Sequence, residues 1–237
     1  MENYSRRHVV KASLWMFGAL CLGLPEIVAA ATEPKNASDS LLNWDKFVHN
    51  LEQRAHEQYG FVWNQDSYVS SVAHLLRNLN LFDKKLRAAM AAYPNHNHGM
   101  PEFAELLKTK DIQISLITFE KNEWLPHHDH PSMTGVLTCA KGDLQVTSYD
   151  RLQPSYSDAS SPTLLKELGS EVISPGKIST LTNTRRNVHT VRAVSFTQVI
   201  DIFTPPYNDE RTTRTTWYKL ERQPVKGQAN VFVAYPY

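Results

Sequence analysis

From Asp111 to the C-terminus the chain is divided into short runs with the pattern of β-strands, and turn residues separate these runs. In the first run Ile112, Ile114 and Leu116 alternate with polar residues, which is the period of a half-buried strand. The later runs cover residues 135–139, 144–149, 171–173, 178–181, 189–191, 195–203, 215–220 and 231–235. Many short strands at this spacing predict a mainly β fold, either a sandwich or a barrel.

The part of the chain before these strands predicts helices. Apolar residues repeat at helical spacing from Trp44 to Leu51, which predicts a helix that begins near Ser38 or Asp39 and ends at Gly60. Two further helices are expected, one over about 66–80 and one over about 82–93. The fold should therefore combine a helical N-terminal segment with a β domain.

The first 31 residues have the pattern of an export signal. Arg6 and Arg7 precede an apolar run over 12–24, and small residues follow up to Ala31. The run is too short to cross a bilayer, and it has no polar face that an ordinary surface helix would need. The paired arginines resemble the bacterial twin-arginine signal, which directs export of folded proteins. We therefore predict a periplasmic location and cleavage near Ala31.

These patterns divide the chain into a signal peptide over 1–31, a linker and N-terminal helical segment over 32–108, and a β-barrel over 109–237. The net charge is +1 and no basic run is present, which argues against nucleic acid or a membrane surface as the partner. Removal of the signal would leave Cys139 as the one cysteine, so no internal disulfide is expected. We expect the mature chain to be a monomer without a membrane span.

Two His-x-His pairs offer imidazoles for a metal ion. Residues i and i+2 of a strand point to the same face, so both rings of such a pair can reach one ion. His96 and His98 lie between helices in a turn-rich stretch, where no strand holds both rings on one face. His128 and His130 follow a strand-like run, and His189 lies in a later predicted strand that a barrel can place opposite them.

Four motifs extend this pattern: Pro-x-His-x-His-Pro-x-Met over 126–133, Ser-Tyr-Asp over 148–150, Asn-x-His over 187–189 and Asp-Ile-x-x-Pro-Pro-Tyr over 201–207. Their order and spacing resemble those of the cysteamine dioxygenase and plant cysteine oxidase family. The resemblance covers roughly residues 105–220. It implies a cupin double-stranded β-helix barrel.

The resemblance also implies a mononuclear Fe(II) centre with His128, His130 and His189 as the metal ligands. Many cupins carry a Glu about five residues after the His pair, where this chain has Gly135, so no carboxylate ligand is expected. Family members oxidise a thiol to a sulfinate with O2, and they act on small aminothiols or on the N-terminal cysteine of peptides.

For two further residues the resemblance leaves a choice of roles. Asp201 matches an acidic residue that lies near the substrate in the family. In one role it is catalytic and binds the substrate by holding an ammonium group. In the other it is a structural residue held by backbone N–H groups. Tyr207 contributes to the substrate site, or it closes the mouth of the barrel. Thr215 and Trp217 stand where the animal enzyme has a Cys and a Tyr that can crosslink, so no crosslinked cofactor is expected.

Two other classes of protein remain open at this point. One is a cupin enzyme that uses its metal ion on a non-thiol substrate, and the other is a non-catalytic periplasmic cupin that binds a metal or a ligand. The identity of the metal separates the two enzyme classes, and turnover with thiol and O2 separates an enzyme from a binding protein.

The export hypothesis makes a direct prediction. Replacing Arg6 and Arg7 together by Lys should leave the precursor in the cytoplasm, because the twin-arginine route requires both arginines. Fractionation of cells that produce the two forms measures this. Unchanged delivery of the double variant to the periplasm would instead indicate the general secretory route.

Overall fold

The computed structural model describes residues 41–57, 63–93, 99–152, 161–210 and 214–237 of the 237-residue chain. Its helices are α1 (Trp44–Glu57), α2 (Gln65–Arg77) and α3 (Lys84–Ala92). Its strands are β1 (Glu102–Lys108), β2 (Gln113–Phe119), β3 (Trp124–Asp129), β4 (Thr134–Lys141), β5 (Leu144–Arg151), β6 (Thr163–Ile173), β7 (Ser179–Leu181), β8 (Val188–Ala193), β9 (Thr197–Thr204), β10 (Trp217–Leu220) and β11 (Val231–Pro236). The predicted signal peptide, the helix start near residue 38 and the His96/His98 pair lie outside the described residues.

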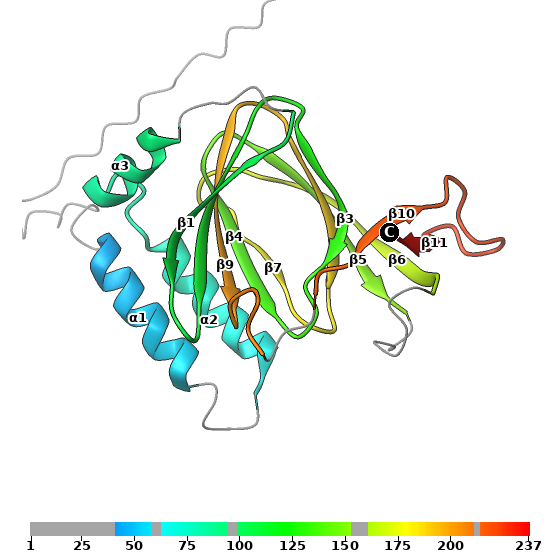
Figure 1. The fold of residues 1–237 in the computed structure, drawn as a ribbon, viewed down its shortest axis with the longest axis horizontal. Coiled ribbons are helices and arrows are strands. Elements are labelled where there is room, and N and C mark those ends of the chain that lie inside the picture. The colour runs from blue at the N-terminus through cyan, green and yellow to red at the C-terminus, as the bar shows by residue number, and fades with distance from the viewer. Residues whose placement is uncertain (1–40, 58–62, 94–98, 153–160, 211–213) are drawn as a thin grey trace, which may run out of the picture. The chain divides into compact units, whose positions relative to one another are not determined.

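The strands form two antiparallel groups (Figure 1). The first is a sheet in the order β1-β2-β9-β4-β7. The second has the order β10-β11-β6-β5-β8-β3 and closes into a barrel, because β10 pairs with β3 as well as with β11. The chain crosses repeatedly between the two groups, as in the double-stranded β-helix of a cupin, and the predicted mainly β fold is confirmed.

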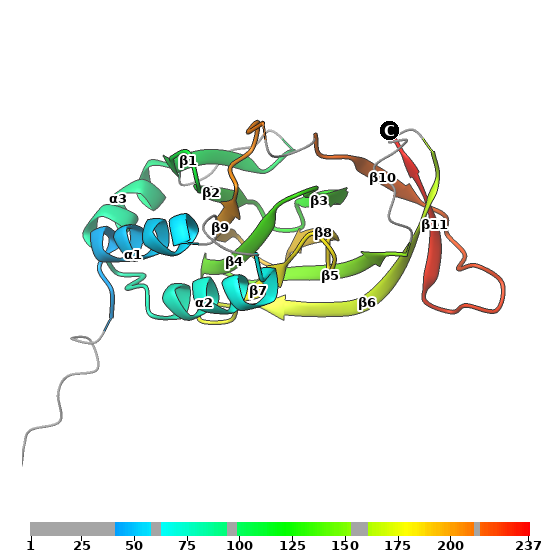
Figure 2. The same ribbon diagram turned by 90° about the horizontal axis from the view of Figure 1, so that it is seen from below.

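The three helices cover the first sheet on the side away from β5 and β6 (Figure 2). Phe47, Leu51 and Leu86 are buried in one apolar cluster with Ile114 of β2 and Ile200 of β9. Each such side chain contributes roughly 1.5–3 kcal/mol when it is removed from water. The helical segment therefore shares its core with the sheet.

Polar contacts also tie the helices to β9. The Gln198 side-chain amide donates to the carbonyl oxygens of Met90 and Tyr93, at 2.9 and 3.0 Å. These contacts satisfy carbonyls at the end of α3 that have no partner within the helix. The Tyr68 hydroxyl of α2 lies 2.7 Å from the Thr204 hydroxyl in the buried interface.

Two further apolar clusters fill the interior. Phe119, Leu144 and Val199 belong to a cluster between the two strand groups. Tyr149 and Tyr218 belong to another, which lies among β5, β6, β8, β10 and β11. Strands β10 and β11 pair at the end of the molecule away from the helices (Figure 2).

Two strands of the structure were not predicted, and one is longer than predicted. Strand β1 lies within the segment 32–108 that the sequence assigns to linker and helices, and its residues do not alternate between apolar and polar. It is a strand because it pairs along β2. Strand β3 contains His128, whose imidazole was expected just after a strand, and β6 begins at Thr163 rather than Glu171. No helix over the described ranges is long and apolar enough to span a membrane.

Candidate metal centre

The pairing of β3 with β8 brings together the histidines of the candidate site. His128 and His189 are direct partners in this antiparallel pair, so their side chains leave the same face of the sheet. An irregularity in the register between Leu125 and His128 precedes this position. His130 follows two residues after His128 and points to the same side, as the spacing predicts.

The three imidazoles converge on one point in the interior. The exposed fractions of His128, His130 and His189 are 5%, 2% and 6%. The Nε2 atom of His189 lies 3.1 Å from that of His128 and 3.2 Å from that of His130. The ligand atoms of the three residues all lie within 4.8 Å of one another. Over the described ranges, this is the one group of three or more His, Cys, Asp or Glu side chains with such geometry.

Burial keeps these imidazoles neutral. It lowers the pKa of His128 to about 4, because the cation loses its hydration, and the hydrogen bond to the Pro126 carbonyl only partly opposes this shift. Burial and the mutual repulsion of the imidazolium forms lower the pKa values of His130 and His189 well below the usual value. Neutral imidazole is the form that binds metal ions.

Contacts on the far side of two rings orient the nitrogens that face the centre. The Nδ1–H group of His128 donates to the Pro126 carbonyl oxygen at 2.7 Å, which leaves the lone pair on Nε2. Nδ1 of His130 lies 2.6 Å from the Tyr207 hydroxyl. Metal-binding histidines commonly make such a contact with their second nitrogen, because it fixes the tautomer and the ring orientation.

The distances from His189 Nε2 to the other two Nε2 atoms are compatible with a shared metal ion. A metal ion at about 2.0–2.1 Å from each nitrogen keeps neighbouring nitrogens roughly 3.0–3.4 Å apart. The observed distances of 3.1 and 3.2 Å fall in this range. A carboxylate at position 135 would not fit, since even a Cβ atom on Gly135 would lie 2.9 Å from Phe203 and 3.0 Å from Leu181.

Apolar and aromatic side chains surround the histidines. A cavity of about 40 Å³ is bordered by the three imidazoles, by Asp201 and Tyr207, and by Phe103, Ile117, Phe119, Leu125, Leu137, Leu144, Val191 and Val199. The Trp217 ring packs on His128 with ring centroids 4.7 Å apart. The Phe203 ring packs on His130 at 4.5 Å.

Asp201 of β9 is the carboxylate of this cavity. Its exposed fraction is 7%. Burial raises the pKa of Asp201 to about 7, and a hydrogen bond from the Ile202 N–H opposes the shift. A carboxylate in this state would be stabilised by a cationic group brought into the cavity.

Two residues of the neighbouring strands stay apart from the ligand set. His127 points away from the three ligands, and its Nε2 atom lies 3.3 Å from the Tyr149 hydroxyl. Cys139 is fully buried, and burial raises the pKa of its thiol to about 12, so it remains unreactive. The packing of Trp217 and Phe203 on the imidazoles was not predicted from the sequence, because these contacts depend on tertiary structure.

A cupin barrel with three convergent neutral histidines defines a class of metal-binding protein. The sequence pattern of the PCO_ADO family matches residues 75–232, which is more than half of the chain. The chain belongs to this family, and the predicted relationship to cysteamine dioxygenases and plant cysteine oxidases is confirmed.

The curated proteins and solved structures to which the chain is similar are distant from it in sequence. The chain is 23% identical over 137 residues to the 2-aminoethanethiol dioxygenase of Mus musculus, a match that covers 50% of this chain and 54% of that protein. The chain therefore spans about half the length of this relative.

Among solved structures, KdgF from Halomonas sp. is 16% identical with a TM-score of 0.36, over 48% of this chain and 86% of that chain. A cupin superfamily protein from Desulfitobacterium hafniense is 12% identical with a TM-score of 0.35, again over 48% and 86%.

The site makes a prediction about metal content. Changing His128, His130 or His189 singly to Ala should lower metal affinity by at least roughly 100-fold, since loss of a direct ligand should exceed the effect of losing a residue behind one. Elemental analysis and metal titration of the purified variants measure this. The controls are His127→Ala, adjacent to the site, and His96→Ala and His98→Ala, which should keep the metal. If only the His96→Ala and His98→Ala variants lost the metal, the metal site would be assigned to His96 and His98 instead.

Proposed function

We propose that the protein is a non-haem Fe(II) thiol dioxygenase that converts a small aminothiol or an N-terminal cysteine to a sulfinate with O2. The observation that carries the proposal is the set of three buried neutral imidazoles without a carboxylate among them. Membership of the PCO_ADO family and the similarity to a 2-aminoethanethiol dioxygenase support the same chemistry.

His128, His130 and His189 would hold the iron through Nε2. A ferrous ion bound there would offer open positions for a thiolate and for O2, and it would pass electrons from sulfur to O2. The reaction R–SH + O2 → R–SO2H is balanced. Sulfur loses four electrons, the two oxygen atoms gain them, and no further reductant is required.

Each surrounding residue has a separate task in this proposal. Asp201 binds the ammonium group of the substrate next to the thiol, as part of the catalytic site. Tyr207 holds the His130 ring through the contact at Nδ1 and borders the substrate cavity. Apolar side chains such as Phe119 and Val191 exclude water, so the two reactants meet without competing solvent.

The small cavity restricts which part of the substrate enters. A space of about 40 Å³ accepts a thiol and a few neighbouring atoms, and the remainder of a peptide would stay outside. Phe103 borders the cavity and is 57% exposed, so it would lie beside such a remainder. On the basis of the export pattern over 1–31, we also propose that the protein acts in the periplasm. Its action there as a monomer is a separate proposal, which the export pattern does not address.

The proposal predicts the fate of both oxygen atoms. Iron-loaded protein supplied with an aminothiol and 18O2 should give a sulfinate that carries two labelled atoms, and mass spectrometry of the product measures this. O2 uptake should depend on the presence of the thiol, because none of the proposed protein ligands is anionic and the bound thiolate provides the negative charge that offsets Fe(II).

Other labelling results would remove the proposal. One labelled atom per product, a disulfide product, or no thiol-dependent O2 uptake by fully iron-loaded protein would leave the non-thiol cupin enzyme or the binding protein. Retention of zinc or nickel rather than iron by protein purified from its native host would likewise favour the non-thiol enzyme.

Asp201 gives a second prediction, about substrate charge. Asp201→Asn should reduce kcat/KM for an aminothiol by roughly 30-fold or more, because loss of one partner of a desolvated ion pair costs about 2 kcal/mol or more. The same variant should affect a thiol of equal size without the amine much less. Steady-state kinetics with both thiols measures the difference, and an equal loss for the two would assign Asp201 a structural role.

A further inference from the structure

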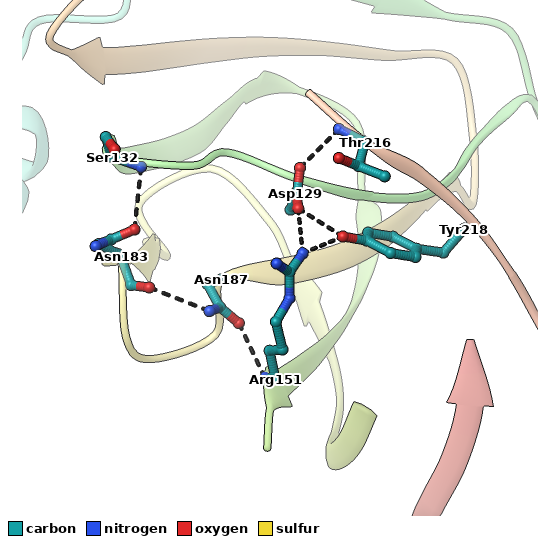
Figure 3. Close-up of polar contacts among 7 residues, drawn as sticks. All are labelled: Asp129, Ser132, Arg151, Asn183, Asn187, Thr216 and Tyr218. Atoms are coloured by element: carbon teal, nitrogen blue, oxygen red, sulfur yellow. Dashed lines mark hydrogen bonds and ion pairs between the residues drawn. The ribbon is translucent and has the colours of Figure 1, made fainter. Parts of the chain in front are cut away.

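A continuous set of hydrogen bonds joins the two chain segments that carry the metal ligands (Figure 3). Asp129 lies between His128 and His130 in sequence, so its side chain points to the opposite face of the extended chain from theirs. One carboxylate oxygen accepts a hydrogen bond from the Thr216 N–H at 2.7 Å, and the other accepts one from the Tyr218 hydroxyl at 2.7 Å. The Arg151 guanidinium donates to that second oxygen and to the Tyr218 hydroxyl.

The backbone of Arg151 continues the set toward the third ligand. Its N–H donates to the side-chain oxygen of Asn187 at 3.1 Å, and Asn187 lies two residues before His189. The Asn187 side-chain amide donates to the Asn183 carbonyl oxygen at 3.1 Å. The Asn183 side-chain oxygen accepts the Ser132 N–H at 3.0 Å, and Ser132 lies two residues after His130 (Figure 3).

Asp129 and Arg151 are buried, and burial restricts the geometry in which their charges can pair. The Asp129 side chain is 4% exposed and that of Arg151 is 11% exposed. Charges removed from water in this way are stable only when each is paired and hydrogen-bonded in a definite arrangement. The three partners come from β3, β5 and β10, so this arrangement fixes three strands relative to one another.

The same contacts also fix the position of Trp217, whose ring packs on His128. Asp129 and Thr216 exchange two hydrogen bonds, since the Asp129 N–H also donates to the Thr216 carbonyl oxygen at 3.1 Å. The next residue, Trp217, is the register partner of His128 and packs on its ring. The position of the indole therefore depends on the Asp129 contacts.

We propose that Arg151 is a positioning residue of the metal centre, whose side chain fixes the segment between His128 and His130 while its backbone fixes the segment before His189. The three imidazoles then keep the spacing that a metal ion requires, because Arg151 acts on them through Asp129, Tyr218 and Asn187. This inference rests on the metal centre of the proposed function and is independent of the thiol chemistry.

Two conservative variants test the proposal. Arg151→Lys keeps the positive charge but loses the planar guanidinium that contacts two oxygens at once. Tyr218→Phe removes the hydroxyl and keeps the buried ring. The matched controls are Arg185→Lys, whose exposed guanidinium lies 3.3 Å from Asp66, and Tyr235→Phe, whose exposed hydroxyl donates to Glu221 at 2.8 Å.

The probe is Co(II) ion alone, titrated into metal-free full-length protein without thiol. Measurements are made well below the Tm of each variant, so that all of them are folded. Arg151→Lys and Tyr218→Phe should raise the Kd for Co(II) by roughly 10- to 100-fold and should change the visible absorption of the bound ion, as expected for a residue that orients metal ligands. The two controls should match the wild-type protein in both respects.

A purely structural role predicts a different result. Arg151→Lys would then lower the Tm but keep the Kd within about twofold of wild type and leave the Co(II) spectrum unchanged, which would overturn the proposal. Wild-type protein that binds no Co(II) would contradict the metal centre itself. Protein that binds Co(II) as expected but does not oxidise thiols would remove only the proposed function.

Discussion

His128, His130 and His189 point their Nε2 atoms at one another inside the barrel, at 3.1 and 3.2 Å for the two contacts with His189. The Nδ1–H group of His128 is already bonded to the Pro126 carbonyl oxygen, so its Nε2 atom presents a lone pair to the centre. Burial lowers the pKa values of the rings, so they remain neutral and able to bind a cation. A divalent cation held by all three nitrogens binds only the folded chain, so metal binding should also stabilise the fold.

The rest of the barrel holds this arrangement in place. The β3–β8 register sets His128 opposite His189, and a slip of one residue would turn one of the two rings to the other face. Phe203 and Trp217 pack on two of the rings and leave them little freedom to rotate. The Asp129–Arg151 ion pair lies behind the site and joins β3 to β5. Apolar side chains therefore border the site on one side, and a buried ion pair helps to hold the strands on the other.

The sequence predicts well those features of the fold and the site that depend on neighbouring residues. The His-x-His spacing places His128 and His130 on one face without reference to the rest of the chain, and alternation identifies β2. The assignment of His189 depended on a motif as well as on a strand pattern.

Tertiary contacts are the part that the sequence did not predict. Strand β1 exists because β2 is beside it, and its own residues have no strand pattern. Asp129 and Arg151 are charged residues of types that usually lie on the surface. Only the folded chain shows that they pair in the interior. The contact of Tyr207 with Nδ1 of His130 joins residues 77 positions apart and has no local sequence pattern.

The most direct test of the metal centre is a crystal structure of the protein loaded anaerobically with Fe(II), with anomalous data collected at the iron edge. The account predicts one strong anomalous peak at roughly 2.0–2.2 Å from the Nε2 atoms of His128, His130 and His189, with no carboxylate among the protein ligands. A peak beside His96 and His98, or one bound by a carboxylate such as Asp201, would contradict it.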